Sequence, residues 1–241
     1  MICDSHIHLP SPDWEHNAKF CSFGTVSAAL DYLKRAGIGR AVFNTWQGVY
    51  CNSSAELDAG NTEVLQWAER EPEFLLPGAV IHPAYPEESR RWLAHFLSLG
   101  HRWVGELVNR SEIPFDDARC LELFAECERH DHIVQLHGTP EVLEVARRFP
   151  KLRVVMSHIP ADPTEAAALP NVTLDISGAA GGLHIGALER AYRAFGPRRL
   201  LFGTDFTGYE PRAFLARVRV VIPARERPWV FEHNLRRLLE S

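Results

Sequence analysis

Histidine, aspartate and glutamate residues stand at the ends of several short apolar runs in this chain of 241 residues. The first run leads into Asp4-Ser5-His6-Ile7-His8, where one aliphatic residue separates two imidazoles. Residues two apart in a β-strand point to the same side, so His6 and His8 would face a common point. Two neutral imidazole nitrogens at this spacing suit one metal ion, and a hairpin of surface histidines is the alternative.

Four further groups that could ligate a metal or transfer protons also lie at the ends of apolar runs: Glu106, His137, His158 and Asp205. A single histidine after a strand is more often a hydrogen-bonded structural residue than a ligand. Polar and charged side chains are seldom buried without partners, so core packing does not explain the whole set. The pattern therefore favours a functional site over a purely structural role for these residues.

Eight apolar runs along the chain are predicted to be β-strands. Each is nearly continuously apolar rather than alternating, which is typical of parallel strands buried on both faces. The predicted strands are Ile2–His6, Ala41–Thr45, Leu75–Ile81, Trp103–Val108, Ile133–His137, Val154–His158, Val172–Ile176 and Leu200–Thr204.

Amphipathic segments follow these strands and are predicted to be helices. They are Val26–Arg35, Ala55–Arg70, Glu87–Leu99, Asp116–Arg129, a helix ending at Arg148, Pro163–Ala168, Leu188–Phe195, Arg212–Val221 and Trp229–Leu239. This alternation predicts an α/β fold, a compact (β/α)8 TIM barrel in a single domain over residues 1–241, with a doubly wound sheet as the rival. In such a barrel the strand-end groups would converge on one face.

Composition narrows the range of partners. The net charge is −5 and basic residues form no run, so nucleic-acid and membrane-surface partners are not favoured. We expect a small-molecule substrate instead. No segment approaches about 20 uninterrupted apolar residues, and the start of the chain lacks the pattern of a signal peptide. Five scattered cysteines indicate reduced thiols rather than a disulfide framework, so we expect a cytoplasmic protein.

Several motifs together resemble the amidohydrolase superfamily, specifically its amidohydrolase-related branch of metal-dependent barrel hydrolases. Asp4-Ser5-His6-Ile7-His8 is similar to the motif of its first strand, and Leu201-Phe202-Gly203-Thr204-Asp205 to that of its eighth. Asp175-Ile176-Ser177-Gly178 resembles its seventh-strand segment. The closing His233-Asn234-Leu235 resembles the last helix, although the family usually has glycine in place of His233.

The resemblance implies a ligand set and two catalytic roles. His6, His8, His137 and Asp205 would hold a divalent metal, most often Zn²⁺, with Mn²⁺ and Fe²⁺ as alternatives that nitrogen and carboxylate ligands also accept. Asp205 would act as general base toward metal-activated water, and His158 would polarise or protonate the substrate.

Glu106 bears on whether one metal or two are bound. The three lysines, Lys19, Lys34 and Lys151, lie away from strand ends, so a carbamylated lysine bridge is not available. A weakly held second metal would be bridged by Glu106, as in the TatD-type deoxyribonuclease branch, which the chain resembles at Val104-Gly105-Glu106. The alternatives are a single metal with Glu106 beside it or beside the substrate, and an ion pair of Glu106 with an arginine.

Three other strand-end residues are candidates for substrate binding: Trp46, His82 and Arg110. Trp46 could pack on a substrate, and Arg110 could pair with a carboxylate or phosphate. Packing of the loops and solvation of the arginine explain these residues equally well.

The leading functional hypothesis is a metal-dependent hydrolase acting on a small amide, lactone or ester. A nonoxidative decarboxylase of the same branch is the first alternative. A TatD-like nuclease with a Glu106-bridged pair of metals is the second, although the chain has Gly-Thr-Asp where that branch has Glu-Thr-Asp. A barrel that binds ligands without turnover is the non-enzymatic alternative, and the family resemblance is compatible with a homodimer.

Overall fold

Eight parallel β-strands form the centre of the computed structural model, which describes residues 1–109, 113–178 and 183–240. Each strand pairs with the next one in the sequence, so the order around the sheet follows the chain. The strands are β1 (Cys3–Leu9), β2 (Arg40–Thr45), β3 (Leu75–Ala79), β4 (Trp103–Leu107), β5 (Ile133–His137), β6 (Arg153–Ser157), β7 (Val172–Asp175) and β8 (Leu200–Leu201).

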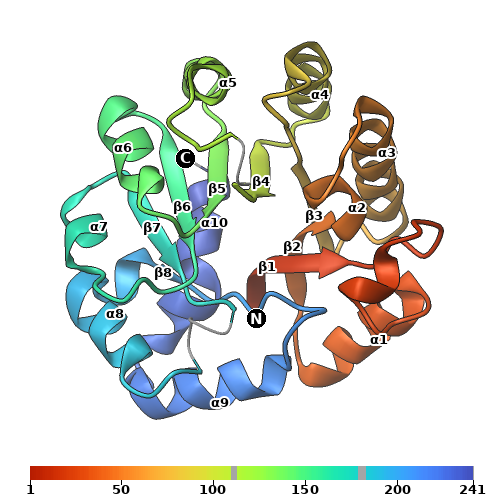
Figure 1. Ribbon diagram of the computed structural model, residues 1–241. Coiled ribbons are helices and arrows are strands. Elements are labelled where there is room, and N and C mark those ends of the chain that lie inside the picture. The colour runs from red at the N-terminus through yellow and green to blue at the C-terminus, as the bar shows by residue number, and fades with distance from the viewer. Residues whose placement is uncertain (110–112, 179–182, 241) are drawn as a thin grey trace.

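The sheet curves until β1 meets the segment that follows β8 (Figure 1). The Ser5 N–H donates to the Phe202 carbonyl at 2.8 Å, and the Asp205 N–H donates to the His6 carbonyl at 2.9 Å. A parallel bridge also joins Ile7 to Phe206. The result is a nearly closed barrel, which confirms the predicted (β/α)8 fold.

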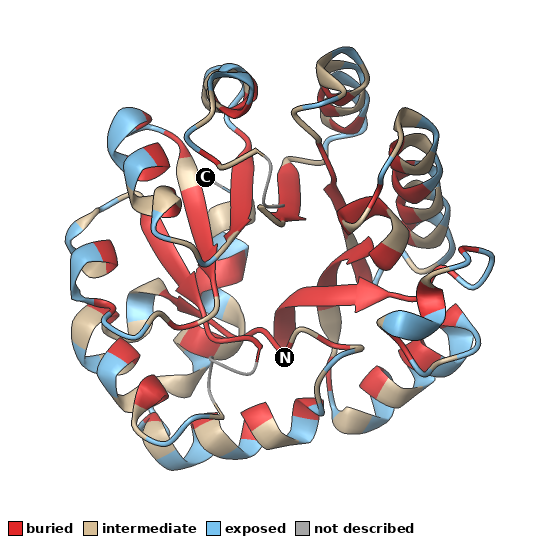
Figure 2. Cartoon of the chain, viewed as in Figure 1, coloured by how far each residue is buried: buried red, intermediate tan, exposed pale blue. Residues whose placement is uncertain are grey.

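Helices alternate with the strands and surround them (Figure 1). They are α1 (Val26–Ala36), α2 (Trp46–Val49), α3 (Ser54–Arg70), α4 (Pro86–Ser98), α5 (Ala118–Arg129), α6 (Glu141–Arg148), α7 (Thr164–Ala168), α8 (Ala187–Phe195), α9 (Pro211–Val221) and α10 (Asn234–Glu240). Figure 2 shows buried strands inside and helices that bury one side and expose the other. None of the described helices combines the length and apolar character needed to cross a membrane.

The bounds of β1 and β8 differ from the predicted ones, and both differences affect the site. β1 continues to Leu9, so His8 lies within a strand whose seven residues are all buried. β8 has only two residues instead of the five predicted. The chain leaves the β8 ladder because Thr204 donates through its backbone N–H (3.1 Å) and its hydroxyl (2.6 Å) to the buried carboxylate of Asp4.

The end of the chain also differs from the single helix predicted over Trp229–Leu239. A π-helical turn, Trp229–His233, precedes α10. At the junction the side chain of Asn234 donates to the carbonyls of Pro197 (2.7 Å) and Leu200 (2.8 Å). The closing helix is thereby fixed to the start of β8.

A buried amide attaches α3 to the segment after β3, and we expect its removal to destabilise the barrel. Asn61 donates to the Val80 carbonyl at 2.9 Å and accepts from the Val80 N–H at 2.8 Å. Asn61→Ala should lower the free energy of unfolding by about 2–4 kcal/mol, because it leaves two buried backbone groups unpaired. Urea denaturation would measure this. Thr62→Ala, at an exposed position of the same helix, is the control and should change stability little.

Candidate metal centre

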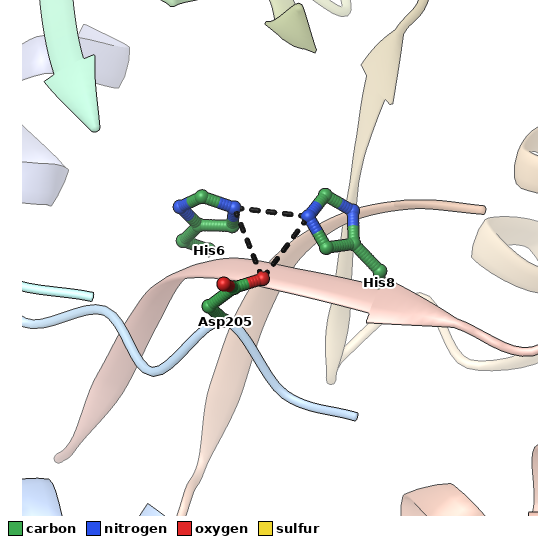
Figure 3. A group of neighbouring side chains, drawn as sticks. All are labelled: His6, His8 and Asp205. Carbon is green, nitrogen blue, oxygen red and sulfur yellow. Dashed lines mark hydrogen bonds and ion pairs between the residues drawn. The ribbon is translucent and has the colours of Figure 1, made fainter. Parts of the chain in front are cut away.

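The two histidines of β1 point toward each other at one end of the barrel. The Nε2 atoms of His6 and His8 are 3.0 Å apart (Figure 3). The register of the β1–β2 ladder shifts between Asp4 and Ile7, beside His6. Such an irregularity re-aims a side chain, and here it accompanies the convergence of the two rings.

Oxygen acceptors fix which nitrogen of each ring carries a proton. His6 Nδ1 lies 2.7 Å from Asp175 Oδ2, and His8 Nδ1 lies 2.5 Å from Asn44 Oδ1. Carboxylate and amide oxygens accept hydrogen bonds, so each Nδ1 is the donor. In the neutral rings both Nε2 atoms then have a lone pair, as metal-binding histidines require.

Asp205, which follows β8, completes a triangle of donor atoms (Figure 3). Its Oδ1 lies 3.3 Å from His8 Nε2 and 3.7 Å from His6 Nε2. Zinc binds nitrogen and oxygen at roughly 2.0–2.1 Å, so neighbouring ligands of a tetrahedral ion are roughly 3.3–3.4 Å apart. The three donors therefore fit a divalent ion in type and spacing.

Glu106 lies between this triangle and a second group of imidazoles. Its Oε2 is 3.3 Å from His6 Nε2 and 3.4 Å from His8 Nε2. Its Oε1 is 3.2 Å from His137 Nδ1 and 3.4 Å from His158 Nε2. Gly105 permits this placement: its φ is +103°, and a Cβ there would lie 2.2 Å from the Gln135 carbonyl oxygen. In the structure, His137 contacts Glu106 rather than the His6–His8 pair.

The electrostatics of this cluster favour positive charge. Burial opposes the ionised form of Glu106, but the charge of His6 and the hydrogen bond from His137 hold its pKa well below its ordinary value. Burial lowers the pKa of His6, yet the charges of Glu106 and Asp175 outweigh it and raise that pKa well above the usual range. For His8, hydrogen bonds to Asp205 and Glu106 likewise outweigh burial and raise the pKa. A divalent cation at this point would also supply the positive charge that the carboxylates favour. It would compete with protons for the imidazole nitrogens.

A series of buried hydrogen bonds fixes the Nδ1 side of His6, opposite the Nε2 atom that faces His8. Trp103 Nε1 donates to Gln135 Oε1 at 3.0 Å, which orients the amide so that Gln135 Nε2 donates to Asp175 Oδ2 at 2.8 Å. The Ser177 N–H donates to Asp175 Oδ1 at 2.5 Å. Asp175 is thus fixed as an acceptor for His6, and the orientation of the imidazole depends on residues from three other strands.

Exposure divides the site into a floor and a rim. The floor comprises His6 and His8, whose side chains are each 1% exposed, and Glu106, at 3%. The rim comprises Asp205 at 14%, His158 at 13% and His137 at 40%. Within this group of described residues, the side chains that a substrate can reach are therefore mainly those of Asp205, His158 and His137.

The residues predicted to bind substrate lie in different places. The Trp46 ring packs on His8, with centroids 4.3 Å apart, and its Nε1 donates to Thr207 Oγ1 at 2.9 Å. His82 lies between β3 and α4, where its Nδ1 accepts from the Ala84 N–H, and it lines a cavity of about 400 Å³. Arg110 lies outside the described residues.

Sequence reasoning assigned no function to Gln135, and it placed Asp175 and Ser177 only within a segment that resembles the family, without a role for either. Gln135 had a signal: it is the only amide within the apolar run Ile133–His137. Ser177 occurs in the segment that resembles the family, but the segment itself does not reveal which side chains the serine contacts.

The fold and this group of histidines and carboxylates at the strand ends define a barrel with a candidate metal centre. A family profile described as amidohydrolase matches residues 3–240. The chain belongs to this amidohydrolase family. Among curated proteins, no sequence matches the chain.

Solved structures share the fold at low sequence identity. An amidohydrolase II structure has a TM-score of 0.83 at 15% identity and covers both chains completely. The 5-carboxyvanillate decarboxylase of Sphingomonas paucimobilis has a TM-score of 0.75 at 14% identity, covering 99% of this chain and 98% of its own. A dihydroxybenzoic acid decarboxylase of Polaromonas sp. JS666, with bound manganese and the inhibitor 2-nitroresorcinol, has a TM-score of 0.73 at 14% identity, covering 99% and 96%.

Replacement of one imidazole on the floor should abolish metal binding. We expect about one equivalent of divalent metal in the wild-type protein and a loss of most of it in His6→Ala, because the triangle of donors then has two members. Elemental analysis after dialysis would measure this. His130→Ala, at an exposed histidine at the end of α5, should keep the wild-type content. Equal metal in His6→Ala and wild type would contradict the assignment.

The acceptor behind His8 should tune the affinity for the metal. Asn44→Ala removes the oxygen that holds the His8 Nδ1–H. Loss of such a partner weakens metal binding by about 10- to 100-fold. Competition with a chelator of known affinity would measure this. An unchanged dissociation constant would show that Asn44 does not orient the ligand.

Proposed function

We propose that the protein is a metal-dependent hydrolase of small amides, lactones or esters, with His6, His8 and Asp205 as ligands and Glu106 beside them. The division between a buried floor and an accessible rim carries this proposal. A divalent cation bound there supplies Lewis acidity, which polarises a carbonyl group and lowers the pKa of water. The residues that can meet a substrate at the rim are the ones that can transfer protons.

Asp205 is suited to accept a proton from the attacking water. Its Oδ1 faces His8, and the Asp205 side chain is partly exposed, at 14%. A carboxylate within hydrogen-bond reach of the nucleophile acts as a general base. The proton it takes leaves hydroxide character on the water, which adds to the substrate carbonyl.

His158 is suited to the other half of the reaction. Its Nε2 faces the interior of the site, 3.4 Å from Glu106 Oε1. From there it can donate a hydrogen bond to the substrate oxygen or a proton to the leaving group. His137, the most exposed member of the rim, lies beside it with ring centroids 4.7 Å apart.

A nonoxidative decarboxylase is the second candidate. It is favoured by the structural neighbours named as decarboxylases of hydroxybenzoic and carboxyvanillic acids. The same rim would serve this reaction, with His158 as the proton donor to the carbon that loses carbon dioxide. The substrate carboxylate would need a cationic partner, for which Arg110 is the candidate from the sequence.

Asp205→Asn should reduce kcat by at least about 100-fold, because the amide cannot accept the proton. Steady-state kinetics at saturating metal would measure this, with bound metal quantified in the same sample to separate loss of the ion from loss of the base. Asp131→Asn is a matched control, since Asp131 also has a positive φ (58°) but is exposed at the end of α5. Full turnover by Asp205→Asn would exclude the role of Asp205.

One assay pair separates the two candidates. Acid release from a panel of lactones, esters and amides reports hydrolysis, and carbon dioxide release from hydroxybenzoic acids reports decarboxylation. We expect turnover in the first panel that is lost in both Asp205→Asn and His6→Ala. Turnover in the second panel alone would replace the hydrolase with the decarboxylase, and no turnover in either would exclude both substrate classes.

A further inference from the structure

We propose that Ser177 is a positioning residue that places the proton of neutral His158 on Nε2. His158 is then a hydrogen-bond donor toward the substrate and not the ligand of a second metal. This inference rests on the proposed function, because it gives a mechanism for the role of His158. The same inference favours one bound metal ion over two, which the position of Glu106 alone does not decide.

The hydroxyl of Ser177 lies between two imidazoles. Its Oγ is 2.9 Å from His6 Nδ1 and 3.0 Å from His158 Nδ1. The residue is fully buried, so water does not supply an alternative partner at the surface. A buried hydroxyl that leaves its proton without an acceptor carries a desolvation cost, so the direction of its hydrogen bond is constrained.

The proton of Ser177 cannot be donated to His6. His6 Nδ1 already carries a proton, because it donates to Asp175 Oδ2 at 2.7 Å. Among the residues that the structure describes, the remaining acceptor recorded for this hydroxyl is His158 Nδ1. Ser177 therefore donates to His158 Nδ1, and a neutral His158 has its own proton on Nε2.

The environment of Nε2 agrees with this tautomer. It faces Glu106 Oε1 at 3.4 Å, which is an oxygen acceptor. The ring is held in place on both sides: it stacks on His6 with centroids 5.4 Å apart and an angle of 25°, and Gly178 lies against its Nδ1 edge. A Cβ at Gly178 would be 2.4 Å from Nδ1, so glycine keeps the ring within reach of Ser177.

This tautomer bears directly on metal stoichiometry. Glu106, His137 and His158 form a second group whose donor atoms lie within 4.8 Å of one another. A metal ligand must present a lone pair, and Nε2 of His158 presents a proton instead. The second group then lacks one of its three donors, and a single ion at the His6–His8 pair is favoured.

The test is to measure the tautomer of His158 directly. Two-bond ¹H–¹⁵N correlation spectra show which imidazole nitrogen carries the proton. They would be recorded at about pH 8, where free imidazole is neutral, on metal-free and on Zn²⁺-loaded protein. His158→Gln identifies the signal. The variants are Ser177→Ala, Ser177→Thr, and the control Ser157→Ala, which removes a neighbouring buried hydroxyl with no recorded hydrogen bond among the described residues.

We expect the Nε2–H form in wild type, Ser157→Ala and Ser177→Thr, and loss of that preference in Ser177→Ala. Zinc titration should give one equivalent in wild type. An Nδ1–H form in wild type would overturn the proposal without any variant, as would an unchanged tautomer in Ser177→Ala or a second equivalent of zinc that depends on His158. Failure to bind any zinc would instead count against the proposed function, because the tautomer is also measured without metal.

Discussion

The carboxylate of Glu106 is buried among four imidazoles, and the organisation of the site follows from the need to compensate its charge. An ionised carboxylate at 3% exposure is costly unless donors or cations surround it. Each of its oxygens faces two imidazole nitrogens at 3.2–3.4 Å. Because the buried carboxylate of Glu106 attracts positive charge, the pocket is suited to bind a cation whether or not a substrate is present.

The closure of the barrel is what allows this compensation. The groups that orient His6 and His8 come from other strands: Asn44 lies in β2, Gln135 lies in β5, and Asp175 ends β7. These positions are far apart in the sequence and meet because parallel strands end on one face. The hydrogen bonds from Thr204 to Asp4 bring the end of β8 against β1 and place Asp205 beside the histidine pair.

Sequence reasoning located the fold because continuous apolar runs and their alternation with amphipathic segments depend on local composition. It also located the strand-end histidines and carboxylates, since a metal-binding residue type is itself a signal. It could not show which of these side chains face one another in the folded protein. Which oxygen of Glu106 faces His137 depends on the path of the backbone at Gly105, and the role of Gln135 depends on Trp103 in the adjacent strand. The two-residue β8 likewise reflects a buried contact with Asp4, about 200 positions away in sequence, that no local pattern shows.

Backbone conformation separates the residues proposed to transfer protons from those that form the floor. His158 (φ 65°) and Asp205 (φ 60°) both adopt left-handed conformations, whereas His6 and His8 lie within β1 and do not have a positive φ. A non-glycine residue in this region costs on the order of 1 kcal/mol or more, so surrounding contacts must hold it there. For His158 these contacts are Ser177 and Gly178, and for Asp205 they include the hydrogen bond from its N–H to the His6 carbonyl. The two rim groups are therefore oriented by the same β1 and β7 segments that orient the floor, which couples the orientation of the residues proposed to transfer protons to the position of the proposed metal ligands.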